Sequence, residues 1–145
     1  MKRGYLLPLL AILLLAALPL LAACTAAHTE GLPEYAYRSD LSLKAYQIAV
    51  AQGELLAQMP CYCGCGADPR YKNLRDCFLD ANGEFNSHAA NCLICQQEAQ
   101  DASQWREEGL STKQIRERID QNYEGRGKPT DTPPVVETAK PGDAG

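Results

Sequence analysis

The sequence predicts a mostly α-helical fold, a small cysteine-rich domain of about four helices with a loop of cysteines and glycines,. Apolar residues recur at helical spacing near residues 41–59 and 112–123,. Few segments alternate apolar and polar residues as half-buried strands do. Both ends of the 145-residue chain differ in composition from the middle, which leaves residues 40–125 as one domain. A domain this small often needs a cross-link or a metal ion to be stable.

The first helix is expected over residues 41–59,. Ser39 or Asp40 can serve as its N-cap, since both side chains accept hydrogen bonds from exposed backbone N–H groups,. Pro60 ends the helix, because the residue before a proline is disfavoured from the helical region,. Gly53 is a weak point inside it,.

Shorter elements follow along the chain. A short helix is predicted over residues 72–79 and a tight turn over residues 80–83,. A second long helix is expected to begin at residue 88 or 91 and to end at residue 108, before a glycine suited to the C′ position,. A capping box at residues 111–114 predicts a last helix over residues 112–123,.

Residues 60–66, which read Pro-Cys-Tyr-Cys-Gly-Cys-Gly, are the most informative stretch of the chain. Packing alone does not require three thiols within five residues,. In an extended strand, neighbouring thiols of this motif would have Cα atoms about 6.6 Å apart, near the upper limit for a disulfide. A folded turn could bring the sulfurs within about 4 Å of each other, as a tetrahedral metal requires. Gly64 and Gly66 permit the positive φ angles of such a turn,.

Three more cysteines and a histidine follow this motif. If the segment after residue 87 is helical, His88, Cys92 and Cys95 occupy positions i, i+4 and i+7 and share one face,. The full set of candidate ligands is Cys61, Cys63, Cys65, Cys77, Cys92, Cys95 and His88.

Four kinds of chemistry fit this set of residues. The thiols, with His88 as an extra ligand, could bind a soft metal such as Cu(I) or Zn(II),. Alternatively, six cysteines of an exported protein form three structural disulfides. A third interpretation is thiol–disulfide exchange by Cys92 and Cys95, because a helix N-terminus lowers the pKa of the first thiol,. Cys–His nucleophilic catalysis is the least supported, because no oxyanion-hole motif is evident.

The N-terminus predicts export. Lys2 and Arg3 precede an apolar run over residues 5–23, and together they are typical of a signal peptide over residues 1–23,. The run ends at Leu-Ala-Ala-Cys24, which resembles a bacterial lipobox and predicts a covalent lipid, with acyl chains such as palmitate, on Cys24. Residues 24–39 are expected to be a tether. The membrane is then a partner through the lipid anchor.

The charge balance and the C-terminus exclude other functions. The net charge is −4, and it becomes more acidic once Lys2 and Arg3 are removed, which argues against binding to nucleic acid,. Residues 126–145 are rich in proline and glycine and carry almost no large apolar residues. They are therefore expected to be a disordered, solvated tail.

These residues carry two resemblances. The lipobox, the Pro60–Cys65 hexapeptide and the Cys-x-x-Cys segment together resemble the bacterial PCYCGC-motif lipoprotein family, a resemblance that covers about residues 41–125. It implies an exported lipoprotein and no particular activity. A weaker similarity, from Cys92-Leu-Ile-Cys95-Gln96 to residue 125, is to the thiol-reductase subunit of cytochrome c maturation. That resemblance implies Cys92 and Cys95 as a redox pair.

The hypothesis from the sequence is therefore a lipoprotein of the bacterial cell envelope, outside the cytoplasm and anchored to a membrane. Its helical domain gathers the cysteines around copper or zinc, and an envelope protein that handles metals or thiols is the expected partner. Thiol–disulfide exchange would be its activity if it is an enzyme.

Overall fold

The computed structural model describes residues 31–135. The predicted signal peptide, Cys24 and residues 136–145 lie outside the described residues. Within the described part, four α-helices and four short 3-10 helices follow one another, with no strand beyond a single bridge between Leu79 and Phe85. The predicted mostly helical class is confirmed. No helix in residues 31–135 is long and apolar enough to cross a membrane.

The predicted first helix is divided in two. Helix α2 spans Asp40–Ala51 and α3 spans Gly53–Leu56. Ser39 is the N-cap of α2, and its hydroxyl accepts a hydrogen bond from the backbone N–H of Ser42 at 3.1 Å. The division falls at Gln52, whose φ of −127° leaves the helical region just before the glycine. Low helix propensity at Gly53 explains why a helix of 19 residues was too long an expectation,.

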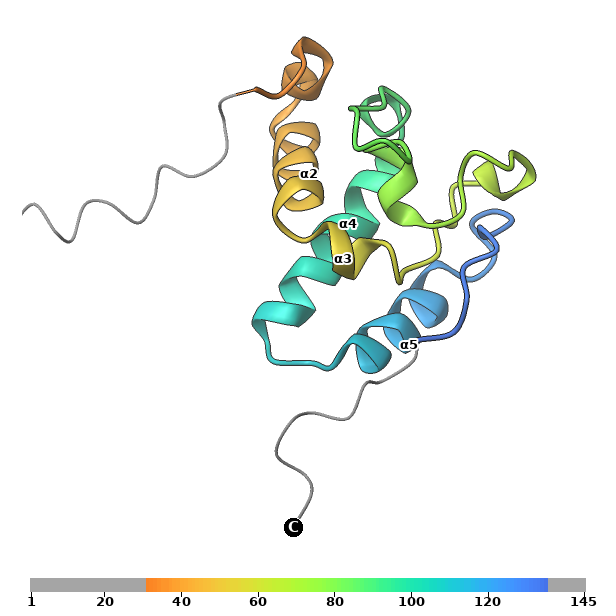
Figure 1. Cartoon of the computed structure of the whole chain (residues 1–145). Helices are drawn as coiled ribbons and strands as arrows, with labels where there is room; N and C mark the ends of the chain where they lie inside the picture. Colours follow the sequence, from red (N-terminus) through yellow and green to blue (C-terminus); the bar gives the residue numbers. More distant parts are fainter. Residues whose placement is uncertain (1–30, 136–145) are drawn as a thin grey trace, which may run out of the picture.

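Helices α4 (Leu93–Glu107) and α5 (Thr112–Tyr123) form the second half of the fold. Gly109 has φ of 89° and ends the turn after α4, as expected of a C′ glycine,. The capping box of Ser111 and Gln114 is formed at the start of α5,. Figure 1 shows α4 lying behind α2 and α3, with α5 beside its far end. This packing leaves the N-terminal end of α4 next to the loop after α3.

The cysteine-bearing segments between the long helices are 3-10 turns. They are η3 (Cys65–Ala67), η4 (Leu74–Cys77) and η5 (Ala89–Asn91). The helix predicted over residues 72–79 is thus a single 3-10 turn, capped by Asn73 through a hydrogen bond from Asp76 N–H. The turn over residues 80–83 is present, closed by a bond from Gly83 N–H to Asp80 O at 3.0 Å. Short 3-10 turns let the chain reverse often, and so return to the same region.

The packed part extends beyond the predicted limits at both ends. Before α2, residues Glu34–Arg38 form the 3-10 helix η2, which buries Ala36, so this part of the predicted tether is folded. After α5, Thr130 and Thr132 are buried. Residues 126–135, here called the C-terminal segment, are therefore not the solvated tail that their composition suggested.

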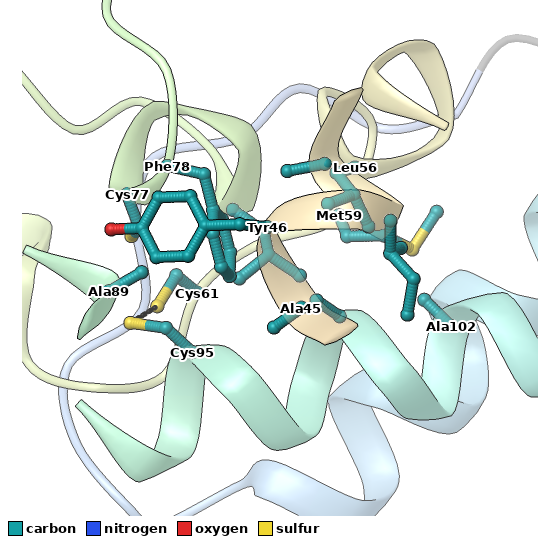
Figure 2. Close-up of a cluster of buried hydrophobic side chains, with 14 of the residues drawn as sticks. Ala45, Tyr46, Leu56, Met59, Cys61, Cys77, Phe78, Ala89, Cys95 and Ala102 are labelled. Atoms are coloured by element: carbon teal, nitrogen blue, oxygen red, sulfur yellow. Dashed lines mark hydrogen bonds between the residues drawn. The ribbon is translucent and has the colours of Figure 1, made fainter. Parts of the chain in front are cut away.

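The core lies between α2, α4 and η4, and cysteines form one edge of it. Figure 2 shows Tyr46 and Phe78 in the middle of this cluster, with their ring centroids 5.2 Å apart in an edge-to-face arrangement,. The Tyr46 hydroxyl donates a hydrogen bond to the backbone carbonyl of Asn86. Cys61, Cys77 and Cys95 are fully buried beside these rings. The same packing that stabilises the fold therefore holds three thiols in place.

Candidate metal centre

The loop after α3 presents the first three thiols from a folded turn. Gly64 has φ of 90°, the left-handed conformation expected at this position,. Gly66 has no positive φ; it is needed because a Cβ there would lie 2.1 Å from the carbonyl oxygen of Pro129. Cys61 is buried, whereas Cys63 and Cys65 are half-buried. The turn therefore runs from the core to the surface.

The other candidate ligands come from three separate elements. Cys77 is the last residue of η4 and is buried. Cys92 is the N-cap of α4, and Cys95 lies buried in its first turn. His88 precedes η5, and its imidazole packs against the ring of Tyr71, with centroids 4.7 Å apart.

The distances between these groups suit a metal ion. The Sγ atoms of Cys61 and Cys95 are 3.5 Å apart. Those of Cys65 and Cys77 are 3.9 Å apart, and Cys63 Sγ lies 3.5 Å from His88 Nε2. Ligands at the corners of a tetrahedron with bonds near 2.3 Å would be about 3.8 Å apart, whereas a disulfide needs about 2.05 Å.

All six cysteines in the described part of the chain are free thiols, and no disulfide joins them. Three overlapping groups have ligand atoms that all lie within 4.8 Å of one another. These groups are Cys61, Cys63, Cys77 and Cys95; Cys63, Cys65, Cys77 and His88; and Cys63, His88, Cys92 and Cys95. The structure thus brings all seven candidate side chains into one cluster, which could hold a metal ion.

The convergence of His88, Cys92 and Cys95 has a different cause from the predicted one. They do not share a face of one helix, because α4 begins only at Leu93 and His88 lies before the separate turn η5. Cys92 is extended, with φ of −123°. The chain reverses between residues 86 and 92 and brings the imidazole back toward the end of α4. A 3-10 turn followed by an N-cap therefore replaces the expected stripe.

Mutual hydrogen bonding divides the thiols electrostatically. The Cys61 S–H holds the pKa of Cys63 well below its ordinary value, and the pKa of Cys61 is raised in return by Cys63. Hydrogen bonding to Cys63 raises the pKa of His88 to about 9. Cys63 is therefore the thiolate around which the other donors are arranged. The pKa of Cys92 is raised by its interaction with Cys63, opposite to the lowering expected at a helix N-terminus.

Glu98 is a functional residue that sequence reasoning missed. Its side chain is fully buried one turn after Cys95, and Oε1 accepts a hydrogen bond from Tyr62 N–H at 2.8 Å. Oε2 has no hydrogen-bond partner, and burial raises the pKa of this carboxyl to about 8. The signal available in the sequence was an acidic residue three positions after a cysteine on the buried face of a helix. Glu98 fixes the backbone between the first two thiols.

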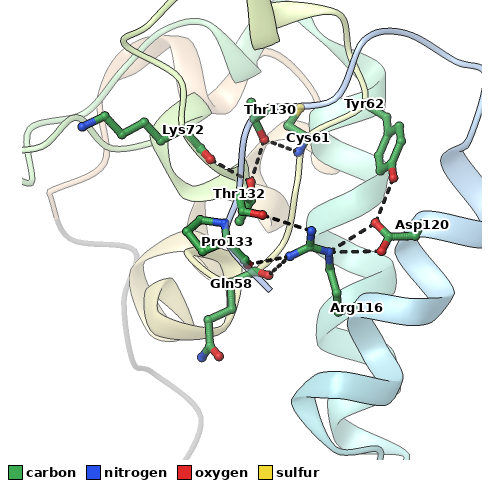
Figure 3. Close-up of polar contacts among 9 residues, drawn as sticks. All are labelled: Gln58, Cys61, Tyr62, Lys72, Arg116, Asp120, Thr130, Thr132 and Pro133. Atoms are coloured by element: carbon green, nitrogen blue, oxygen red, sulfur yellow. Dashed lines mark hydrogen bonds and ion pairs between the residues drawn. The ribbon is translucent and has the colours of Figure 1, made fainter. Parts of the chain in front are cut away.

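The C-terminal segment lies across the same loop. Cys61 N–H donates to Thr130 Oγ1 at 2.9 Å, and Thr130 N–H donates back to the Cys61 carbonyl at 3.0 Å (Figure 3). The hydroxyls of Thr130 and Thr132 are 2.9 Å apart, and Thr132 donates to the carbonyl of Lys72 at 2.7 Å. A Cβ on Gly127 would lie 2.7 Å from the Tyr62 carbonyl oxygen. The segment and the thiol loop are thus in direct contact.

Arg116 of α5 holds this segment in place. Its guanidinium donates to the carbonyls of Gln58, Thr132 and Pro133 at 3.0–3.2 Å (Figure 3). Asp120, one turn further along α5, pairs with Arg116 at 3.2 Å and accepts a hydrogen bond from the Tyr62 hydroxyl at 2.8 Å. One guanidinium therefore joins α5, the end of the α3 turn and the C-terminal segment.

The fold and the cluster define a class, small helical proteins with a thiol-rich centre that could bind a metal ion. A family model described as "protein of unknown function with PCYCGC motif" matches residues 21–135, and the chain belongs to this family. The motif occupies residues 60–65 and supplies Cys61, Cys63 and Cys65. Neither the curated proteins nor the solved structures yield a match to the chain. The comparisons do not show the weaker similarity to the cytochrome c maturation subunit.

Proposed function

We propose that the protein is an exported, membrane-anchored lipoprotein that binds a soft metal ion, Cu(I) or Zn(II), through its clustered cysteines. The observation that carries the proposal is the set of three overlapping four-ligand groups, each with its ligand atoms within 4.8 Å of one another. Six thiols and one imidazole form a soft donor set, and no carboxylate belongs to any of the three groups. Such donors select Cu(I) and Zn(II) over Mg²⁺ and Ca²⁺.

Thiolate content places Cu(I) slightly ahead of Zn(II). Each group has at least three cysteines, and the most enclosed group has four, from Cys61, Cys63, Cys77 and Cys95. Zinc tolerates mixed nitrogen, oxygen and sulfur ligands, whereas thiolates alone favour the softer ion. Delivery of the ion to an envelope protein, or its storage, would be the role of such a centre outside the cytoplasm.

The lipid anchor is proposed from the N-terminal sequence. Lys2, Arg3, the apolar run and the small residues before Cys24 support cleavage and acylation at that cysteine,. The family match begins at residue 21 and so includes Leu21–Cys24. A Cys24→Ala variant in the native host is expected to leave the membrane fraction after cell fractionation. Equal membrane retention of the variant and the natural protein would contradict lipid anchoring at this residue.

Metal analysis together with thiol counting tests the binding function. The domain is purified under reducing conditions without chelator, and its copper and zinc are measured by mass spectrometry of the digested sample. Free thiols are then titrated before and after a strong chelator is added. We expect bound metal, few reactive thiols before chelation and six after it from the described cysteines. Absence of metal even after incubation with excess Cu(I) or Zn(II) would overturn the proposal.

Thiol–disulfide exchange is the second candidate. The half-buried position of Cys92, at the N-cap of α4 three residues before the buried Cys95, favours it. Against it, Cys92 and Cys95 share one ligand group with Cys63 and His88, and the thiol of Cys92 is not activated. A Cys95→Ser variant tests it, because an exchange enzyme of this kind would trap a partner as a mixed disulfide through Cys92.

A further inference from the structure

The cluster has more ligands than one metal ion uses. A tetrahedral zinc or a thiolate-bound copper takes at most four protein ligands in a closed site. The cluster offers seven, all of them members of at least one four-ligand group. A single ion would leave three candidate ligands without a role.

The overlap between the groups is uneven. Cys63 belongs to all three groups, whereas Cys61, Cys65 and Cys92 each belong to one. Cys77, Cys95 and His88 each belong to two. A thiolate sulfur has several lone pairs and can bind two metal ions at once, whereas the Nε2 atom of a neutral imidazole has a single lone pair and cannot. Of the residues shared between groups, Cys63 is therefore the one suited to join every pair of them.

We propose that the centre holds at least two soft metal ions at the same time and that the thiolate of Cys63 bridges them. This inference rests on the proposed metal binding and concerns the number and arrangement of the ions. The inner ion lies among Cys61, Cys63, Cys77 and Cys95, three of which are fully buried. The outer ion is bound by Cys63 and His88, which are both half-buried, together with the flanking cysteines.

Charge balance supports two ions over one. Six thiolates carry six negative charges, and like charges this close repel strongly in a medium of low dielectric constant. One divalent ion would offset only two of them. Each further cation reduces the repulsion and lets more of the thiols ionise and bind. The basic side chain nearest to the thiolates is His88, which is itself a candidate ligand.

The two positions differ in access. The inner group faces the core beside Tyr46 and Phe78, and the C-terminal segment is bonded to the backbone of Cys61 on its outer side. The outer group sits at the half-exposed end of the turn and at the N-cap of α4. The inner ion is therefore retained and supports the fold. The outer ion is the one that exchanges with a chelator or a partner protein.

Cadmium-113 tests the bridge, because Cd²⁺ replaces Zn²⁺ at thiolate sites and two cadmium nuclei joined by one sulfur show mutual scalar coupling. The reduced domain is loaded with excess ¹¹³Cd²⁺, desalted and studied by native mass spectrometry and ¹¹³Cd NMR. We expect two or more cadmium ions per chain and at least one pair of coupled resonances. Stepwise chelation should remove the ions in two kinetic phases.

Two variants sharpen the result. Cys63→Ser is expected to reduce the cadmium content by at least one ion and to abolish the coupling. Cys65→Ser is the matched control, because it leaves two groups that share Cys63 intact, and it should keep both ions and their coupling. If Cys63→Ser does not fold, the natural sequence still decides the question through its stoichiometry and coupling.

The possible outcomes separate the two proposals. One cadmium per chain, or two resonances without coupling, would overturn the bridged arrangement and leave metal binding standing. No bound cadmium, copper or zinc would overturn the proposed function itself.

Discussion

The sulfur atoms of Cys61 and Cys95 lie 3.5 Å apart in the core, although 34 positions separate them in the sequence (Figure 2). One thiol comes from the turn after α3 and the other from the first turn of α4. Both side chains are fully buried beside Tyr46 and Phe78. This contact joins the tri-thiol loop to the α4 cysteines, and the shared centre depends on it.

Metal removal should destabilise the domain. Binding to the folded state alone, at a free metal concentration of 100 times Kd, stabilises a protein by about 2.7 kcal/mol. For a domain of this size we expect chelation to lower Tm by about 10 °C or more. Thermal unfolding followed by circular dichroism, under reducing conditions with and without zinc, measures the difference. Mg²⁺ is the control, since thiols do not bind it; an equal shift with Mg²⁺ would contradict a thiol site.

Arg116 should matter more than its neighbour Arg118. Arg116→Gln removes charge-assisted hydrogen bonds to three backbone carbonyls and is expected to cost about 2 kcal/mol of unfolding free energy,. It should also speed the loss of bound metal, because the C-terminal segment is no longer fixed. Arg118→Gln is the control on the same helix, as Arg118 makes an exposed ion pair with Glu108 at 3.7 Å,. Equal effects in urea unfolding would show that the segment contributes nothing.

Gly127→Ala should push the C-terminal segment away from the thiol loop. The added Cβ would lie 2.7 Å from the carbonyl oxygen of Tyr62 and 2.8 Å from the nitrogen of Gly64, so the backbone must shift. We expect metal affinity to fall about tenfold or more, equivalent to about 1.4 kcal/mol. Competition with a chromophoric chelator measures it. Lys128→Ala, at the next and exposed position, should change the affinity by less than about twofold,.

Glu98 should act as a positioning residue through its hydrogen bond with Tyr62 N–H. Glu98→Gln keeps an oxygen acceptor at the same place, whereas Glu98→Ala leaves a buried N–H group without a partner. We expect the alanine variant to lose about 1–3 kcal/mol of stability and to bind metal more weakly. The glutamine variant should retain both properties. If the two variants weaken metal binding equally, the charge of Glu98 and not its acceptor oxygen is what matters.

The elements set by local physical chemistry were predictable from the sequence. The Ser39 N-cap, the Ser111 capping box and the C′ position of Gly109 all depend on residues within one turn of each other. The apolar stripe of α5, with Ile115, Ile119 and Tyr123 buried, follows the same local spacing,. The density of thiols at residues 61–65 likewise indicated sulfur chemistry without any tertiary information.

The remaining features depend on contacts between distant residues. The C-terminal segment has the composition of a solvated tail, and only its bonds with Cys61, Lys72 and Arg116 order it. The turn before α4 was expected to be helical, since periodicity does not report where an N-cap with extended backbone interrupts it. Glu98 is acidic and so was expected at the surface. In each case a tertiary hydrogen bond overrode the local preference.

A double-mutant cycle on Cys61 and Cys95 tests the shared centre most directly. Metal affinity is measured by chelator competition for the natural domain, Cys61→Ser, Cys95→Ser and the double variant, with apo-state stability recorded for each. If both thiols bind the same ion, the losses are not additive, and we predict a coupling energy of about 0.5–3 kcal/mol. Additive losses, or affinity that one of the two substitutions leaves unchanged, would contradict a common site.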